Sequence, residues 1–153
     1  MNKSKLFDHL HHICIVVEDL ARTTAYYESL GIGPWEDFPP LEKFRAELDS
    51  PDIEGFMKMK YKYTSVGDVQ LQLCEPGTSN TPQAEWLRTH GEGVFHLGFS
   101  VHHLDFSERH AYSLGLSTLI RGRSKDGSGF NYFDTRNEAG VMLLIRANGE
   151  NGT

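Results

Sequence analysis

The sequence predicts an α+β fold in which one strand–helix–strands unit occurs twice. Two stretches, 12–32 and 96–116, align without gaps when the chain is shifted by 84 positions, and the apolar residues keep their places. The identical pairs are His12 and His96, Val17 and Val101, Leu20 and Leu104, Ser29 and Ser113, Leu30 and Leu114, and Gly31 and Gly115. Such a repeat indicates one supersecondary unit used twice, with helices against one face of each sheet.

The composition limits the class of protein. The chain has 153 residues, of which 39% are hydrophobic and 24% charged, as expected of a globular domain with a real core. A net charge of −6 argues against a nucleic-acid partner, because such proteins carry a basic surface. No apolar run approaches the roughly 18 residues of a membrane span, and no apolar segment near Met1 indicates a signal peptide. We therefore expect a cytoplasmic protein without a membrane partner.

The first unit begins with a strand and a helix. The run His11–Val17 is short, apolar and rich in β-branched residues, which predicts a strand. Glu18 and Asp19 then offer a helix start, and apolar residues at helical spacing continue to Leu30. Gly31 follows as a helix stop.

A charged segment separates this helix from a predicted hairpin. Residues 41–54 have no clear periodicity, so we expect a mobile or partner-contacting excursion there. From Phe56 to Tyr63, Met and Tyr alternate strictly with Phe and Lys, which predicts a strand with a lysine face. A tight turn at 66–68 leads to an alternating strand at 69–73, and the two strands form a hairpin.

The second unit follows a linker and repeats the order. Thr81 is a suitable cap for a short helix that begins at Pro82 and stops at Gly91. The other expected elements are a strand at 95–101, a helix at 104–114, a strand at 116–120, a polar glycine-rich loop at 121–129 and a hairpin of strands 130–133 and 141–145. We expect a single domain over 1–153, with one module at about 8–76, a linker and short helix at 77–91 and a second module at about 94–147.

Two histidines occupy the same point of each unit. If the units pair about a pseudo-twofold axis, His12 and His96 face each other across a shared groove. Gln70 and Gln72 lie on a strand whose alternate positions are apolar, where a polar side chain requires a hydrogen bond or a ligand. Two imidazoles and the amide oxygen of Gln72 suit a divalent metal in an open site completed by water. The alternative is a pair of structural core histidines. The other histidines are interpreted as solvated: His9, His11, His90, His102, His103 and His110.

Several motifs together resemble a known superfamily. They are the run 12–20 with Tyr26-Tyr27 and Leu30-Gly31, the run 72–76, Trp86-Leu87 with the run 90–96, and the run 130–135 followed by Gly140-Val141. These resemble the vicinal oxygen chelate proteins, which include glyoxalase I, methylmalonyl-CoA epimerase, extradiol dioxygenases and bleomycin-resistance proteins. The runs 72–76 and 86–96 are most similar to methylmalonyl-CoA epimerase. Only residues 36–56 lie outside the resemblance.

The resemblance implies a fold, a cofactor and an assembly. Two βαβββ modules would form a cupped mixed sheet around a divalent metal ion (Zn, Co, Ni, Mn or Fe), and the protein would be a homodimer. The family's metal residues carry over to His12, Gln72 and His96. The fourth, normally a glutamate that is both ligand and base, falls on Leu144. Its loss removes a charge that supports the metal and a proton acceptor, and general-base assistance is typically worth roughly 10²–10⁴-fold in rate.

Five further residues are weaker candidates. If the lysine face points into the cup, Lys58 or Lys60 could be a base or bind an anionic substrate; a solvated lysine face is the alternative. Arg121 and Arg123, beside glycines, could form a flap over a carboxylate or phosphate, with an ordinary exposed loop as the alternative. Cys14 could line the cup, although its apolar strand equally favours a reduced core thiol.

Two functions remain open on these observations. The first is a metal-dependent isomerase or lyase that acts on a small carboxylic acid, thioester or hemithioacetal through an enolate-like intermediate. The second is a non-catalytic protein that binds or sequesters a small molecule. Leu144, with Met142 on the same strand face, favours the second function because it makes that end of the cup apolar.

Overall fold

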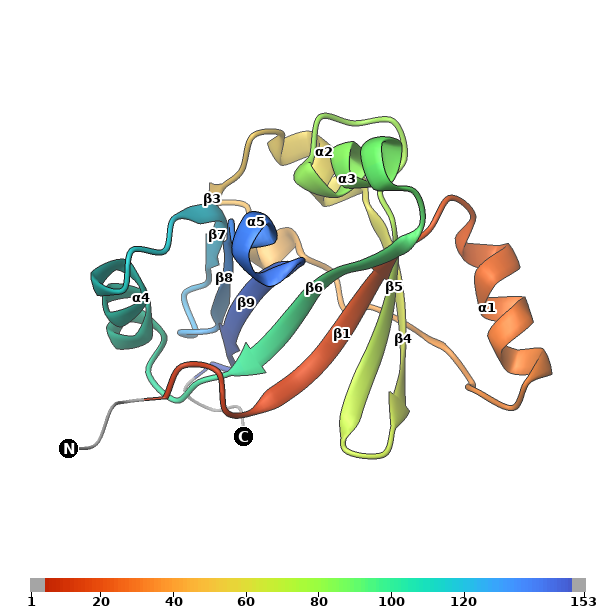
Figure 1. Cartoon of the computed structure of the whole chain (residues 1–153), viewed down its shortest axis with the longest axis horizontal. Coiled ribbons are helices and arrows are strands. Elements are labelled where there is room, and N and C mark those ends of the chain that lie inside the picture. The colour runs from red at the N-terminus through yellow and green to blue at the C-terminus, as the bar shows by residue number, and fades with distance from the viewer. Residues whose placement is uncertain (1–4, 150–153) are drawn as a thin grey trace.

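The strands of the protein form one curved sheet (Figure 1). The structure, a computed structural model, describes residues 5–149. Within that range the sheet has nine strands in the order β2-β4-β5-β1-β6-β9-β8-β7-β3. The first-unit strands β2, β4 and β5 therefore lie on one side of the β1–β6 pair. The second-unit strands β9, β8 and β7 lie on the other side, with the first-unit strand β3 at the far edge. The predicted α+β fold with a cupped mixed sheet is confirmed.

The first unit follows the predicted order. Its main elements are β1 (Leu10–Val16), α1 (Leu20–Ser29), β4 (Lys60–Val66) and β5 (Val69–Glu75). Helix α1 begins where predicted, because the Asp19 side chain accepts a hydrogen bond from the Arg22 N–H. Strand β1 pairs in parallel with β5, and β5 pairs antiparallel with β4.

The second unit repeats this arrangement after α3 (Pro82–His90), which Thr81 caps. Its elements are β6 (Gly93–Ser100), α4 (Leu104–Ser113), β7 (Thr118–Arg123), β8 (Gly129–Phe133), α5 (Arg136–Ala139) and β9 (Met142–Ala147). Strand β6 pairs in parallel with β9, as β1 does with β5. The antiparallel β1–β6 pair joins the units.

Apolar side chains pack on both faces of the sheet. Leu20 of α1 packs with Leu73, and Leu104 and Ala111 of α4 pack with Ile145. A third cluster, which includes Phe56, Trp86 and Phe95, fills the other face beneath α2 (Ile53–Lys58) and α3. None of the helices within residues 5–149 combines the length and apolar character that crossing a membrane requires.

The predicted strand from Phe56 was wrong over its first four residues. Residues 56–58 belong to α2, because the Asp52 side chain caps that helix by accepting from the N–H of Gly55 and also binds the N–H of Asn80. Phe56 is 1% exposed and packs in the core as part of the helix. The strand β4 begins only at Lys60.

Residues 36–49, here called the connecting segment, include most of the stretch 41–54 that the sequence predicts to be a mobile or partner-contacting excursion, and they form short elements of the fold. The segment contributes β2 (Glu36–Asp37), η1 (Glu42–Phe44) and β3 (Glu47–Asp49). Strand β2 pairs with β4 at one edge of the sheet, and β3 pairs with β7 at the other. Phe44 and Leu48 are buried in the core. The segment therefore crosses the open side of the cup and packs on its own chain.

Candidate active site

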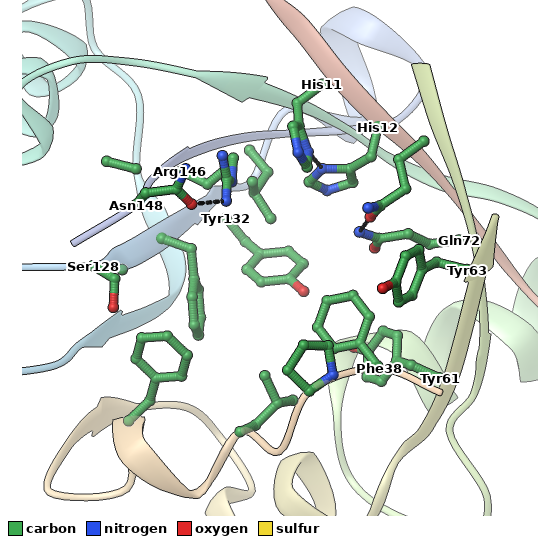
Figure 2. Close-up of a pocket in the computed structure, with 18 of the residues that line it drawn as sticks. His11, His12, Phe38, Tyr61, Tyr63, Gln72, Ser128, Tyr132, Arg146 and Asn148 are labelled. Carbon is green, nitrogen blue, oxygen red and sulfur yellow. Dashed lines mark hydrogen bonds between the residues drawn. The ribbon is translucent and has the colours of Figure 1, made fainter. Parts of the chain in front are cut away.

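A cavity of about 330 Å³ lies on the concave face of the sheet. Figure 2 shows side chains from both units and from the connecting segment around it. Phenylalanines give it an apolar wall, formed by Phe38, Phe44, Phe56 and Phe130. Histidine, glutamine, tyrosine and arginine side chains line the rest. The volume suits a small ligand.

His12 and His96 meet at this cavity, as the repeat predicts. His12 of β1 lies opposite Gly98, and His96 of β6 lies opposite Cys14, so the two positions are related by the pseudo-twofold axis. Their Nε2 atoms are 3.0 Å apart, and the rings are nearly perpendicular. His12 is 5% exposed and His96 is 1% exposed.

His11 extends this pair, contrary to its interpretation as solvated. Its Nδ1 lies 2.7 Å from Nδ1 of His12, and its side chain lines the cavity. Adjacent strand residues normally point to opposite faces. The β1–β6 register shifts between Leu10 and His12, and such an irregularity re-aims side chains. A bulge of this kind left no signal in the sequence.

The three linked histidines are neutral at pH 7. Burial lowers the pKa of His96 to about 3. Burial, together with the charge of Arg146, lowers the pKa of His11 to about 4. The pKa of His12 is also well below its usual value, because of burial first and then of His96, His11 and Arg146. Neutral imidazoles can accept a proton.

The predicted glutamines also lie at the cavity. Gln70 and Gln72 both line it, and Nε2 of Gln72 donates a hydrogen bond to Oε1 of Gln70 at 2.6 Å. Gln72 lies opposite Cys14 in the β1–β5 pair. At the corresponding place in the second unit, Leu144 lies opposite Gly98. Leu144 therefore occupies the position that the repeat assigned to it, and it is 3% exposed.

Arg146 is a cavity residue that the sequence reasoning missed. It follows Leu144 on the same face of β9 and lines the cavity (Figure 2). Its guanidinium donates to Oδ1 of Asn148 at 2.6 Å and to Oγ of Ser100 at 3.3 Å. The alternation along β9 was readable, but the inward direction of Arg146 depends on strand pairing that the sequence does not show.

Two tyrosine side chains bring polar groups to the apolar wall. Tyr61 and Tyr132 line the cavity, and Figure 2 shows the Tyr132 hydroxyl pointing into it. Burial raises the pKa of both phenols well above the usual range, so they remain protonated donors. The Tyr132 ring also packs edge-on against His96, with ring centroids 4.9 Å apart.

The weaker candidates lie away from the cavity. Lys58 is exposed at the end of α2, and Lys60 is exposed and lies 3.7 Å from Glu75. Arg121 and Arg123 bind Glu108 of α4 instead of forming a flap, because β7 continues through Arg123. The last of these candidates, Cys14, is enclosed in the core. It is 1% exposed, and burial raises the pKa of its thiol.

The donor atoms present do not fit the divalent metal ion that the resemblance implies. A spacing of 3.0 Å between the two Nε2 atoms would suit neighbouring ligands of one ion. However, Leu144 offers no oxygen, and residues 5–149 contain no metal-binding group of three His, Cys, Asp or Glu side chains. Metal-bound histidines usually donate their second ring nitrogen, whereas Nδ1 of His96 is buried without a partner in the described part of the chain. Arg146 adds a positive charge nearby.

A family comparison agrees with this architecture. Residues 11–132 match the profile of the Glyoxalase/Bleomycin resistance protein/Dioxygenase superfamily. The chain belongs to this superfamily. A search of curated protein sequences returns no match for this glyoxalase-superfamily chain.

Solved structures share the glyoxalase fold with this chain. Methylmalonyl-CoA epimerase from Mycobacterium tuberculosis is 21% identical with a TM-score of 0.71, over 97% of this chain and 93% of that chain. A variant of the Streptomyces coelicolor epimerase, in complex with 2-nitronate-propionyl-CoA, is 20% identical with a TM-score of 0.72, over 96% and 99%. A hypothetical protein from Bacillus halodurans is 19% identical with a TM-score of 0.67, over 94% and 96%. At these identities the likeness shows the fold.

Proposed function

We propose that this glyoxalase-superfamily chain is an isomerase or lyase that moves a proton on a small carboxylic acid, thioester or hemithioacetal. The observation that carries the proposal is the set of linked, neutral imidazoles of His11, His12 and His96 at the cavity. Neutral imidazole is the commonest proton acceptor in enzyme sites. The epimerases among the structural neighbours support the same reaction class.

The chemistry follows from the groups around the cavity. An imidazole nitrogen takes the proton from the carbon next to a carbonyl, and the electron pair of the broken C–H bond moves onto the carbonyl oxygen. A protonated tyrosine hydroxyl, from Tyr61 or Tyr132, donates a hydrogen bond to that oxygen as its negative charge develops. Return of the proton to the other face, or to a neighbouring atom, completes an epimerisation or isomerisation.

No step of this mechanism passes through a metal ion. The metal dependence implied by the resemblance is not part of the proposal, because the donor set lacks a carboxylate. The homodimer and the cytoplasmic location remain proposals that rest on the resemblance and on the sequence. A thioester is favoured among the substrates by the bound ligands of the epimerases, which are acyl-CoA compounds.

Exchange of a carbon-bound proton with deuterium tests the proposal. Wild-type protein in D₂O is incubated with short acyl-CoA thioesters and 2-substituted carboxylic acids, and exchange is followed by proton NMR. We expect exchange with at least one compound and a loss of roughly 10²–10⁴-fold in His12→Gln. The His110→Gln variant, changed on α4 away from the cavity, should keep wild-type exchange. Absence of exchange with every compound, or full exchange in His12→Gln, would contradict the proposal.

The second candidate function is binding without catalysis. Leu144 favours it, because the family's glutamate is absent at that position and the side chain makes the cavity floor apolar. A protein of this kind would bind one of the same compounds stoichiometrically in calorimetry and leave its carbon-bound protons in place. The exchange experiment therefore separates the two functions.

A further inference from the structure

Arg146 stands out among the arginines that are at least half-buried. Arg121 and Arg123 bind the Glu108 carboxylate, and Arg136 binds Asp134. The hydrogen-bond partners of Arg146 are the neutral oxygens of Ser100 and Asn148. No aspartate or glutamate within residues 5–149 lies at ion-pair distance from it. Its charge is therefore not balanced within the described part of the chain.

A charge in this position is costly unless something compensates it. Burial lowers the pKa of Arg146, which reflects the loss of water around the guanidinium. A buried charge is normally paired with an opposite charge or a set of strong hydrogen bonds. A guanidinium has five N–H donors, and the two described hydrogen bonds use only part of them. The remaining donors are available to a ligand in the cavity.

The surroundings of Arg146 favour an anion. Leu144, the preceding residue on the same face of β9, is apolar, and His11 and His12 nearby are neutral. The positive charge at this end of the cavity is therefore not opposed by a carboxylate from the strand. A guanidinium binds a carboxylate through two parallel hydrogen bonds, which fixes orientation as well as charge.

We propose that Arg146 binds a carboxylate of the ligand, and that this guanidinium supplies the positive charge that a metal ion supplies elsewhere in the superfamily. The ligand is thus a small organic acid whose carboxylate lies beside Arg146 and whose remaining atoms lie against the phenylalanine wall. The assignment of Arg146 to carboxylate binding rests on the proposed function only for the reaction that the bound ligand undergoes. Binding itself does not depend on turnover.

Calorimetry with simple dicarboxylates tests the assignment. Malonate and its neutral diamide, malonamide, are titrated into wild-type protein that has been treated with EDTA. We expect malonate to bind and malonamide to bind at least tenfold more weakly, because a hydrogen bond between two charged groups is stronger than one to a neutral amide. Arg146→Gln should lose that preference, and Arg146→Lys should keep part of it. Arg136→Gln removes a half-buried arginine outside the cavity and should behave as wild type.

Two results would overturn the assignment. One is equal malonate affinity in wild-type protein and in Arg146→Gln, with the fold of the variant confirmed by circular dichroism. The other is malonate binding that appears only after Zn²⁺ or Mn²⁺ is added. Malonate binding through Arg146 without proton exchange on any acid would instead refute only the proposed function. Proton exchange that Arg146→Gln leaves unchanged would refute only the anion site.

Discussion

Gly98 leaves room for the His12 ring because it has no side chain. A Cβ atom at this position would collide with the carbon and nitrogen atoms of that ring. The equivalent position in the other unit is Cys14, opposite His96, and there a thiol is accommodated. The two histidines are related by the repeat, but the small residues that face them are not the same. His12 therefore depends on glycine where His96 does not.

Gly98→Ala should displace the His12 ring and destabilise the protein. Overpacking in a filled site typically costs about 1–3 kcal/mol, and the variant should also lose proton exchange because the imidazoles no longer align. Urea unfolding followed by circular dichroism measures the first effect. Gly93→Ala is the matched control on the same strand, since a Cβ there meets no atom within 4 Å. Equal stability of the two variants would show that the ring adapts without cost.

The sequence repeat was sufficient to predict that His12 and His96 converge, and that Leu144 replaces a polar residue. It could not predict His11, because a shift in strand register lets this neighbour of His12 reach the same cavity. Arg146 was missed for a related reason. Whether a charged residue near a strand end faces inward or outward depends on long-range pairing, and the repeat offers no matching arginine in the first unit.

At the scale of elements, a polar network fastens α4 to β7 and β8. The Glu108 carboxylate accepts hydrogen bonds from Arg121, Arg123 and Asn131 at 2.6–3.1 Å. Arg123 also donates to the backbone carbonyls of Gly122 and Phe130. The glycines and arginines of 121–129 predict a loop. In the structure Glu108 of α4 compensates the charges of Arg121 and Arg123, and the sequence of 121–129 alone could not show this partner.

Glu108→Ala should therefore be strongly destabilising. Removing one partner of a buried ion pair leaves the other charge uncompensated and costs about 3–5 kcal/mol. Asp105→Ala is the control, because Asp105 contacts the same Arg123 from a side chain that is 71% exposed, and exposed pairs contribute less than about 1 kcal/mol. Thermal unfolding of both variants measures the difference. Similar losses in the two would mean that the network contributes no more than a surface ion pair.

At the scale of the whole molecule, the buried neutral histidines should make stability depend on pH. The folded-state pKa values of His96 and His11 are about 3 and about 4, below the unfolded value near 6.5. Between these values the unfolded chain binds more protons than the folded one, so stability falls as pH decreases below about 6.5. His96 alone contributes a slope of up to about 1.4 kcal/mol per pH unit.

Urea unfolding between pH 7.5 and pH 4.5 measures that slope. His96→Gln should give a shallower decline than the wild type, because one proton-binding difference is removed. His110→Gln, changed on α4 away from the cavity, should keep the wild-type slope. A pH-independent wild-type stability in this range would show that these histidines take up protons in the folded protein as readily as in the unfolded chain.

The connecting segment supplies both outermost strands of the sheet. β2 and β3 are two and three residues long, and their side chains are mainly acidic. Short, charged edges discourage the sheet from continuing into another molecule. Because β3 of the first unit pairs with β7, the outermost strand of the second, the two units are joined at this edge as well as at the β1–β6 pair, and neither forms a sheet that is complete without the other.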